Sequence, residues 1–313
     1  MVPATDAADA LFVEQRPRLI GLAYRLLGSL ADAEDAVADT YLRWRELDHR
    51  SLERPEAYLT TMVTRRSLDR LRLQARRREV YVGPWLPEPV PIGLLDGGCP
   101  TGGDPADVVL LAESLTLGFL TVLDRLDPLE RAAFLLHDVF GEPYLSVSSV
   151  LDRREDACRQ LVHRARRHVA AEHRRSRRPE PARQQRLLAA FATALASGDI
   201  EELRRHLADD VVVVSDGGAA VRAARRPVVG AHRVSRFLVG IARRRSARTT
   251  VTWAVCNGEP ALVVDDPEGR GLRVFVYETD GERIRAIHIV SNPDKLAAVR
   301  RSLSGTVGAH DRT

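Results

Sequence analysis

The 313-residue chain has few cysteines. There are only three, Cys99, Cys158 and Cys256, and they lie far apart. Their odd number and the lack of any CxxC pair exclude a disulfide scaffold and a zinc site of ordinary spacing. We therefore expect no metal site and no cofactor.

Long apolar runs are also missing. No run approaches the ~18 residues that a membrane-spanning helix needs, and the segment Met1–Asp6 lacks the basic stretch and apolar core of a signal peptide. These absences predict a cytoplasmic protein without a membrane partner. Apolar residues make up 44% of the chain and charged residues 29%, which is typical of globular domains.

Lysine is nearly absent, because Lys295 is the only one and 46 of the 47 basic residues are arginine. Arginine suits bidentate contacts to phosphate and guanine, although a GC-rich genome would produce the same bias. Its distribution is more informative. Between His163 and Arg186, nine arginines stand against two acidic residues, a local charge of +7. This block favours a polyanionic partner or a solvated surface.

Hydrophobic periodicity divides the chain into three units. Helical spacing from Leu11 to Arg78, and again from Val108 to about Arg175, predicts two all-α domains. Between them, Val80 to Asp107 holds six prolines and many glycines, so we expect a linker that leaves the two helical domains free to tumble. The remainder opens with an amphipathic helix from Gln184 to Ala196 and continues with alternating apolar patterns, which predict an antiparallel sheet and an α+β fold.

The strand patterns of the third unit are short and regular. The expected strands are Val211 to Val214, Thr249 to Cys256, Ala261 to Val264, Leu272 to Thr279 and Arg283 to Val290, with a hairpin at Asp280-Gly281. In the last strand, strict alternation places Ile287 and Ile289 on one face. It places Ile284, Ala286, His288 and Val290 on the other.

The segment from Pro143 to Val169 has the element lengths of a helix-turn-helix. A short helix at Leu145 to Leu151, a break at Asp152-Arg153-Arg154 and a longer helix from Glu155 are expected. One face of the longer helix is apolar, with Cys158, Leu161, Val162, Ala165 and Val169. The opposite face is basic and suits a major groove, although an ordinary solvated helix is the alternative. The candidate DNA contacts are Arg153, Arg154, Arg159, Gln160, His163, Arg164, Arg166 and Arg167.

Two segments of the first unit carry opposite charges. Ala31 to Trp44 is expected to begin with Asp32 as its N-cap, and its acidic face lies opposite a stripe of Val37, Tyr41, Trp44 and Leu47. Arg54 to Arg72 combines the aromatic Tyr58 with several arginines. Aromatic side chains stack on unpaired bases and arginines hold phosphates, so this pattern is typical of single-strand binding, with a solvated amphipathic helix as the alternative.

The order of these motifs resembles an extracytoplasmic-function sigma factor of the sigma-70 class. The resemblance spans about residues 8–172 and is carried by the acidic helix, by Arg65 to Arg72, by Leu126 to Leu136 and by Cys158 to Val169. It implies promoter recognition and transcription initiation, with core RNA polymerase and promoter DNA as partners. Asp152 stands where the family often has glycine, and the serine-rich helix before it is a poor helix former.

The same resemblance implies roles for particular residues. Asp32, Asp35, Asp39 and Trp44 would bind polymerase, and the helix-turn-helix residues would read the minus-35 element. Tyr58, Arg65, Arg66, Asp69 and Arg70 would open and read the minus-10 element. The expected domains are residues 8–79 (sigma region 2), 80–107 (linker), 108–175 (sigma region 4), 183–300 and a tail, 301–313.

Residues 183–300 resemble a SnoaL-like domain of the nuclear-transport-factor-2-like superfamily, a cone of helices against a curved sheet. Three motifs resemble signatures of the sigma factor subgroup that carries such a domain. They are Trp85-Leu86-Pro87-Glu88-Pro89, Asp216-Gly217-Gly218 and Asn292-Pro293-Asp294-Lys295-Leu296. The resemblance implies interdomain contacts that regulate the sigma domains. Ala219-Ala220 replace the glycine and lysine that usually follow the middle motif.

Two alternatives remain for the third unit. It could sense an unknown small molecule, or it could be a cyclase or isomerase with a helical appendage. The candidate catalytic groups are Asp216, Asp265, Asp266 and His288, with Trp253 and Tyr277 as wall residues. Because the sequence fixes no titratable partner for His288 and fold analogy does not supply chemistry, we predict a sigma factor that is not an enzyme.

Overall fold

The computed structural model describes residues 4–78, 80–91, 94–95, 110–172 and 179–310. The chain forms two compact units, one of Met1–Glu79 with Ile92–His173 and the other of Val80–Pro91 with Arg174–Thr313. The first part of the predicted linker therefore belongs to the second unit. Most of the linker after Pro91, and the predicted helix start at Val108, lie outside the described residues.

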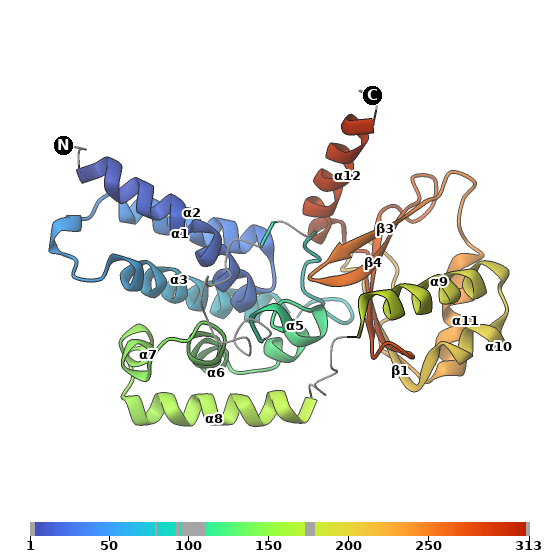
Figure 1. The fold of residues 1–313 in the computed structure, drawn as a ribbon, viewed down its shortest axis with the longest axis horizontal. Coiled ribbons are helices and arrows are strands. Elements are labelled where there is room, and N and C mark those ends of the chain that lie inside the picture. Colours follow the sequence, from blue (N-terminus) through green and yellow to red (C-terminus); the bar gives the residue numbers. More distant parts are fainter. Residues whose placement is uncertain (1–3, 79, 92–93, 96–109, 173–178, 311–313) are drawn as a thin grey trace. The chain divides into compact units, whose positions relative to one another are not determined.

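The first unit is built from helices (Figure 1). α1 (Ala4–Leu27) packs against α2 (Leu30–Trp44) and α3 (Pro55–Arg78), and a 3-10 turn lies at His49–Ser51. Further elements of this unit are α5 (Leu117–Asp124), α6 (Pro128–Phe134), the π-helical turn Leu135–Val139, α7 (Tyr144–Leu151) and α8 (Glu155–Glu172). The predicted all-α character of this unit is confirmed.

The start of α2 differs from the prediction. Ser29 is the N-cap, and its hydroxyl accepts a hydrogen bond from the Asp32 backbone N–H at 3.2 Å. Asp32 therefore lies in the first turn of the helix, where a carboxylate is favoured by the helix dipole. The prediction of Asp32 as N-cap was wrong because Ser29 lies three residues earlier and satisfies the same free backbone donors.

The two helical parts of the first unit pack against each other. α3 contacts α6 and α7, and α1 contacts α5 and α6. Two buried arginines bond across this boundary: Arg131 donates to the Leu26 carbonyl at 2.7 Å, and Arg25 donates to the Ser114 hydroxyl at 2.7 Å. The expectation that the linker leaves these parts free to tumble is wrong for this structure, since buried guanidinium groups are costly without such partners.

The second unit contains a six-stranded sheet in the order β2-β1-β6-β5-β4-β3. The strands are β1 (Leu207–Asp216), β2 (Val228–Val229), β3 (Thr250–Cys256), β4 (Glu259–Asp265), β5 (Arg273–Thr279) and β6 (Ile284–Val290). Five were predicted, and β2 was not. β1 and β6 pair in parallel, so the prediction of an antiparallel sheet was wrong for this pair, while the other neighbouring strands are antiparallel.

Three helices cover one face of this sheet. α9 (Pro181–Ser197), α10 (Ile200–Arg205) and α11 (Ala231–Ala242) pack on it through residues such as Phe191, Leu203 and Leu238, which meet Phe275 and Ile287 in one core. The α+β class is confirmed. Sequence periodicity found α9 but missed α10, α11 and α12 (Ala297–His310), and α12 covers most of the predicted tail.

The last strand contains a bulge that changes which residues face the core. Thr279 pairs with Ile284 and Glu278 pairs with Ala286, so Arg285 is an extra residue in β6. The bulge brings Ile284 into the core with Ile287 and Ile289. The predicted position of Ile284 on the His288 face was therefore wrong.

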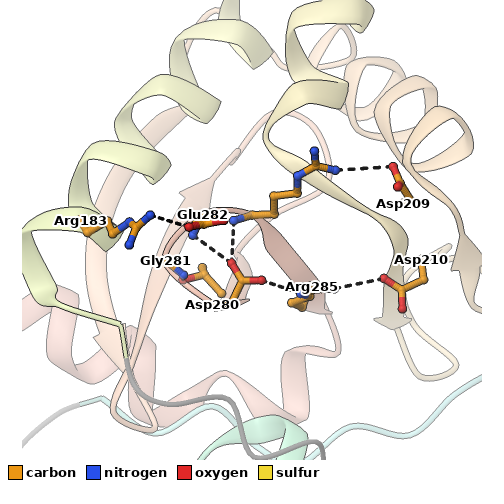
Figure 2. A network of polar contacts seen from close by, with 9 residues as sticks. Arg183, Asp209, Asp210, Asp280, Gly281, Glu282 and Arg285 are labelled. Carbon is orange, nitrogen blue, oxygen red and sulfur yellow. Dashed lines mark hydrogen bonds and ion pairs between the residues drawn. The ribbon is translucent and has the colours of Figure 1, made fainter.

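The predicted hairpin between β5 and β6 is confirmed, and a polar network surrounds its turn (Figure 2). The Asp280 carboxylate accepts hydrogen bonds from the backbone N–H groups of Glu282 and Arg283 at 2.9 and 2.8 Å. It also pairs with Arg285 at 2.7 Å, and Arg183 of α9 pairs with Glu282 at 2.6 Å. These side chains are exposed or half-buried, so the network resembles a surface ion-pair cluster.

Candidate functional site

α7, a tight turn and α8 form the predicted helix-turn-helix. Asp152 closes α7 in the left-handed region at φ 52°, a conformation that favours glycine and that aspartate adopts more readily than most residues. Cys158, Leu161, Val162 and Ala165 are buried on the inner face of α8, as predicted. Burial raises the pKa of the Cys158 thiol, so this residue packs as a small apolar side chain.

The outer face of α8 and the turn expose every predicted minus-35 residue, but the arginines there fall into two groups. Arg164 pairs with Glu130 at 2.6 Å, and Arg166 makes two bonds of 2.7 Å to Asp138. The hydrogen bond to Asp138 raises the pKa of Arg166. These two arginines tie α8 to the rest of its unit.

The other predicted residues are less constrained. Arg159 pairs with Glu155 within the helix at 3.1 Å and lies over the Tyr144 ring, and Arg153 bonds the Asp152 carbonyl. Within the described part of the chain, the side chains of Arg154, Gln160, His163 and Arg167 make no hydrogen bond or ion pair. They are the groups most available to a ligand.

The acidic face of α2 lies against arginines of α3. Arg70 is within 3.5 Å of carboxylate oxygens of Asp32 and Asp35 and within 3.2 Å of Asp39, which also pairs with Arg66 at 3.3 Å. The predicted polymerase-binding acids and two predicted minus-10 arginines thus form one charged cluster. Asp35 is the most exposed acid, with 69% of its side chain accessible.

Trp44 does not lie on this surface. Its side chain is fully buried, and its indole N–H donates to the Ala8 carbonyl at 3.1 Å. The prediction that Trp44 contacts polymerase was wrong, because the stripe that it completes faces α1. A tryptophan in a helix of mixed polarity supplies more apolar surface for packing than any other residue.

Four of the five predicted minus-10 residues line one cleft, and the fifth, Arg70, lies in the charged cluster with the α2 acids instead. Tyr58, Arg65, Arg66 and Asp69 of α3 border a cavity of about 670 Å³, which Asp39 and neighbouring residues of α2 close from the other side. Tyr58 is partly exposed there. Arg65 also donates to the carbonyls of Ser149 and Val150 at 2.8 and 2.9 Å, at the carboxyl end of α7.

In the second unit, the three signature motifs meet at one buried carboxylate. Asp216 is fully buried and accepts hydrogen bonds from the Tyr81 hydroxyl at 2.5 Å, the Leu86 N–H at 2.8 Å, the Gly218 N–H at 3.0 Å and the Lys295 ammonium at 2.7 Å. We call Tyr81, Leu86, Asp216, Asn292 and Lys295 the Asp216 clamp.

Several further contacts hold the linker segment in the clamp. The Lys295 ammonium also donates to the Leu86 carbonyl at 2.5 Å and lies 4.0 Å from the centre of the Trp85 ring. The Asn292 amide donates to the Tyr81 hydroxyl at 2.9 Å. Burial and the bond to Asp216 raise the pKa of Tyr81, so it remains a donor.

The other signature residues lie around the clamp. Residues 86–90 are buried, Glu88 among them, and Leu296 is fully buried, whereas Pro293 is half-buried and Asp294 is exposed. No larger residue fits at the two glycines of the middle motif. A Cβ at Gly217 would lie 2.1 Å from the Val221 carbonyl, and one at Gly218, where φ is 57°, would lie 2.7 Å from the Asn292 side chain.

Sequence reasoning missed two residues that hold the linker. Tyr81 was passed over because it precedes the proline-rich motif. Asn257 exchanges two hydrogen bonds with the Val90 backbone, at 2.9 and 2.8 Å. Asn257-Gly258, both with positive φ, form the turn between β3 and β4. An Asn-Gly pair between apolar runs is a strong hairpin signal that could have located this turn.

The candidate catalytic groups are not gathered in one place. His288 lies on the face of β6 away from the helices and pairs with Glu278 at 2.5 Å, whereas Asp216 belongs to the clamp. Asp266 is buried, accepts a bond from Ser246 at 2.5 Å and lies 3.6 Å from Arg273. Tyr277 is buried in the core next to the exposed Trp253, and Asp265 ends β4.

Two family models match the helical unit, sigma-70 region 2 over residues 11–77 and sigma-70 region 4 over residues 117–169. They enclose the acidic and basic helices and the helix-turn-helix. The chain belongs to the extracytoplasmic-function RNA polymerase sigma factors, which direct core polymerase to promoters and initiate transcription.

Particular relatives cover nearly the whole chain. It is 36% identical to the sigma factor SigJ of Mycobacterium tuberculosis over an alignment of 314 residues, and this alignment covers 96% of this chain and 98% of SigJ. It is 31% identical over 306 residues to the probable sigma factor SigI of the same organism, with the same coverage. The crystal structure of SigJ is similar with a TM-score of 0.71 and 33% identity over 93% of this chain and 98% of SigJ. The SnoaL-like assignment of the second unit is thereby confirmed.

Among the helices that the structure describes, none has the length and hydropathy to cross a membrane. Within the same residues, no group of three or more His, Cys, Asp or Glu side chains is placed to hold a metal ion.

Proposed function

We propose that the outer face of α8 and the preceding turn read the minus-35 element. The observation that carries this proposal is an exposed basic face opposite a continuous buried stripe. Arg159 lies near the amino end of α8, where side chains reach base edges, and Arg167 lies two turns further, where they reach phosphates. Arg164 and Arg166 position the helix through Glu130 and Asp138 and present their remaining N–H groups to the backbone.

Run-off transcription and DNA binding with single variants test these roles. Arg159→Ala should cost ~1–3 kcal/mol at one promoter position and relax selectivity there. Arg167→Ala should weaken binding to all sequences and lower the salt slope by about 1. Arg186→Ala, on the exposed side of α9, removes the same charge and is the control. Equal losses on every sequence for Arg159→Ala and Arg167→Ala would contradict the assignment.

For the minus-10 element, we propose that the cleft between α2 and α3 receives unpaired DNA. Tyr58 offers an aromatic face to a base, and Arg65 and Arg66 offer charge to phosphates at the same opening. Asp69 borders the cleft and restrains Arg72 at 2.8 Å. Asp35, with Asp32 and Asp39 beside it, is the proposed contact to core polymerase.

Promoter binding on this proposal requires the two helical parts to separate. Elements centred about 25 base pairs apart lie roughly 85 Å apart along B-DNA at ~3.4 Å per base pair. α8 is only about 27 Å long at ~1.5 Å per residue, and Arg65 joins α3 to the end of α7 at 2.8 Å. Separation would release Arg65 to the minus-10 strand.

The SnoaL-like unit is proposed to regulate the sigma domains through the Asp216 clamp, without catalysis. The clamp holds residues 81–90, and these residues lead directly to the connection between the two sigma regions. The scattered candidate catalytic groups support regulation over chemistry. Because its partners are core polymerase and promoter DNA, the protein is proposed to act in the cytoplasm.

Truncations test the regulatory proposal by transcription with purified core polymerase. Removing residues 183–313 should lower activity, since the linker loses its anchor. Removing residues 292–313 takes away Asn292 and Lys295 but leaves Asp216 and Asn257 to hold the linker through Leu86 and Val90, and should raise activity by releasing a brake. If both truncations behave alike and Trp85→Ala leaves protease cleavage of residues 80–91 unchanged, the second unit does not regulate through the linker.

A ligand-sensing role is a second candidate, and one observation favours it. A cavity of about 360 Å³ opens on the helix-covered face of the sheet, bordered by α11 and by strands β1, β5 and β6. Cavities of about 300–1,000 Å³ commonly hold small molecules.

A further inference from the structure

The cavity of about 360 Å³ beside α11 has a floor formed by a row of paired side chains that crosses three strands. Ser215 of β1 pairs in register with Ile289 of β6, which pairs with Phe275 of β5. Arg273 precedes Phe275 on the same face of β5. The floor therefore combines apolar side chains with one hydroxyl and one guanidinium group.

The charged residues that line the cavity are all basic. Five arginines border the cavity and no acidic residue does; they are Arg222, Arg236, Arg244, Arg270 and Arg273. We call this the arginine cavity. In the described residues, only Arg273 of these five has an acidic partner, the buried Asp266 at 3.6 Å. Like charges gathered in one place repel each other, so a bound anion would stabilise this arrangement.

Two polar atoms at the floor are buried without partners. Arg273 is only 4% exposed and Ser215 only 3%, yet the Arg273 Nε and the Ser215 Oγ make no hydrogen bond within the described structure. Buried polar groups in folded proteins are nearly always paired, because an unmade bond costs about 1–3 kcal/mol. Both atoms can donate, so one acceptor group placed beside them would satisfy both.

The pKa of Arg273 lies below its ordinary value, so an anion bound beside it would stabilise the charged guanidinium. Burial lowers this pKa, the charge of Asp266 opposes the effect, and Arg270 and Arg245 add to it. Asp266 is committed elsewhere, since it accepts the Ser246 hydroxyl and the Arg270 backbone N–H. One carboxylate shared in this way does not balance the arginines around it.

The apolar side chains define the rest of the ligand. Phe237 and Ile241 of α11 face the row formed by Phe275 and Ile289 across the cavity. An inorganic ion would leave this apolar surface uncovered, whereas a molecule with an apolar body would bury it.

We propose that the arginine cavity binds a small organic anion, with its carboxylate or phosphate group on Arg273 and Ser215 and its apolar body against Phe237, Ile241 and Phe275. The role of such a ligand as a signal rests on the proposed regulatory function of the SnoaL-like unit, but its binding does not. Arg236 and Arg244 at the opening would steer the anion and close over it.

Titration calorimetry on the full chain with octanoate, octyl phosphate and octanol tests the proposal. These probes share an apolar body and differ in the head group, so the first two arms distinguish a carboxylate from a phosphate ligand. At least one anion should bind and octanol should not. Arg236→Gln/Arg244→Gln should weaken anion binding at least roughly tenfold, because charged hydrogen bonds are lost.

The matched control is Arg233→Gln/Arg243→Gln, which removes two exposed arginines from the same helix and its C-cap but not from the cavity. It should change binding less than about twofold, as expected for screened charges. Ser215→Ala should weaken binding without changing the net charge. Equal affinity for octanol, equal loss in both double variants, or no binding of either anion at millimolar concentration would overturn the proposal. Anion binding without any effect of the truncations on transcription would refute the regulatory function instead.

Discussion

The Asp216 clamp allows a sharp test, because it contains the only lysine of the chain. Asp216→Asn keeps the shape of the side chain but removes its charge, and so leaves the Lys295 ammonium buried without a counter-charge. Removing one partner of a buried ion pair costs roughly 3–5 kcal/mol. The lower end applies here, since Lys295 keeps the Leu86 carbonyl and the Trp85 ring.

Amine-reactive labelling followed by mass spectrometry measures this loss directly. Lys295 is 9% exposed, so it should react only when the clamp opens. At ~1.4 kcal/mol per tenfold, a loss of ~3 kcal/mol raises the open fraction and the labelling rate roughly 100-fold. The labelled peptide identifies Lys295 without ambiguity, because the only other primary amine is the α-amino group.

Glu282→Gln provides the matched control. It breaks the exposed pair with Arg183, whose side chains are 52% and 69% accessible, and such surface pairs contribute about 0–1 kcal/mol. Lys295 labelling should change less than about twofold in this variant. If Asp216→Asn labels no faster than Glu282→Gln, the clamp does not depend on the buried pair and the account of it is wrong.

Three further predictions concern other surfaces. Asp35→Lys should weaken binding to core polymerase in a pull-down through charge repulsion, while the circular dichroism spectrum stays unchanged; normal competition for core would place the docking face elsewhere. Glu142→Gln breaks the half-buried ion pair with Arg18 at 3.0 Å. Because this loss corresponds to ~1 kcal/mol, amide hydrogen exchange in α7 should become about fivefold faster, whereas the control Glu155→Gln should leave it unchanged. Equal exchange rates in the two variants would refute this prediction. Burial would raise the pKa of Asp280, but bonds from the Arg283 and Glu282 backbone and from Arg285 lower it overall. The stabilising effect of the Asp280 carboxylate is therefore present above the ordinary pKa of ~3.9 and is lost as the pH falls through the lower pKa of the folded protein. Urea unfolding at pH 7 should show that Asp280→Asn lowers the free energy of unfolding by at most ~1 kcal/mol, and this difference should disappear in acid. A difference that persists in acid would contradict the prediction.

Periodicity predicted the helical elements of the first unit because their apolar stripes are regular. The stripe that contains Trp44 was found, but the helix it packs against could not be predicted, because only the packing of α1 on α2 shows that this tryptophan is internal. Likewise, a proline-rich linker predicts loose domains, whereas Arg25 and Arg131 join the two parts through bonds to residues distant in sequence.

In the second unit, the alternation of apolar and polar residues located most strands but did not predict how they pair. The parallel pairing of β1 with β6 depends on the crossover through the rest of the unit, which no local pattern encodes. The bulge at Arg285 shifts Ile284 by one position, and a single inserted residue reverses the faces on its side of the bulge. α11 was missed although Val234, Phe237, Leu238 and Ile241 follow helical spacing and pack into or against the core, so its apolar stripe could have located it.

Motif resemblance located most of the clamp but could not supply its geometry. Asp216, Lys295 and the linker motif were each expected at an interface, and the structure joins them around one carboxylate. The arginine cavity was not expected at all, since its lining comes from five separate segments of the sequence.

Run-off transcription with purified core polymerase on a pool of promoter fragments measures promoter selection by this protein. The full chain should produce transcripts from a small subset of promoters, and Arg159→Ala should change this subset while Arg186→Ala should not. Transcription that is absent, or identical with and without this protein across the whole pool, would contradict this prediction.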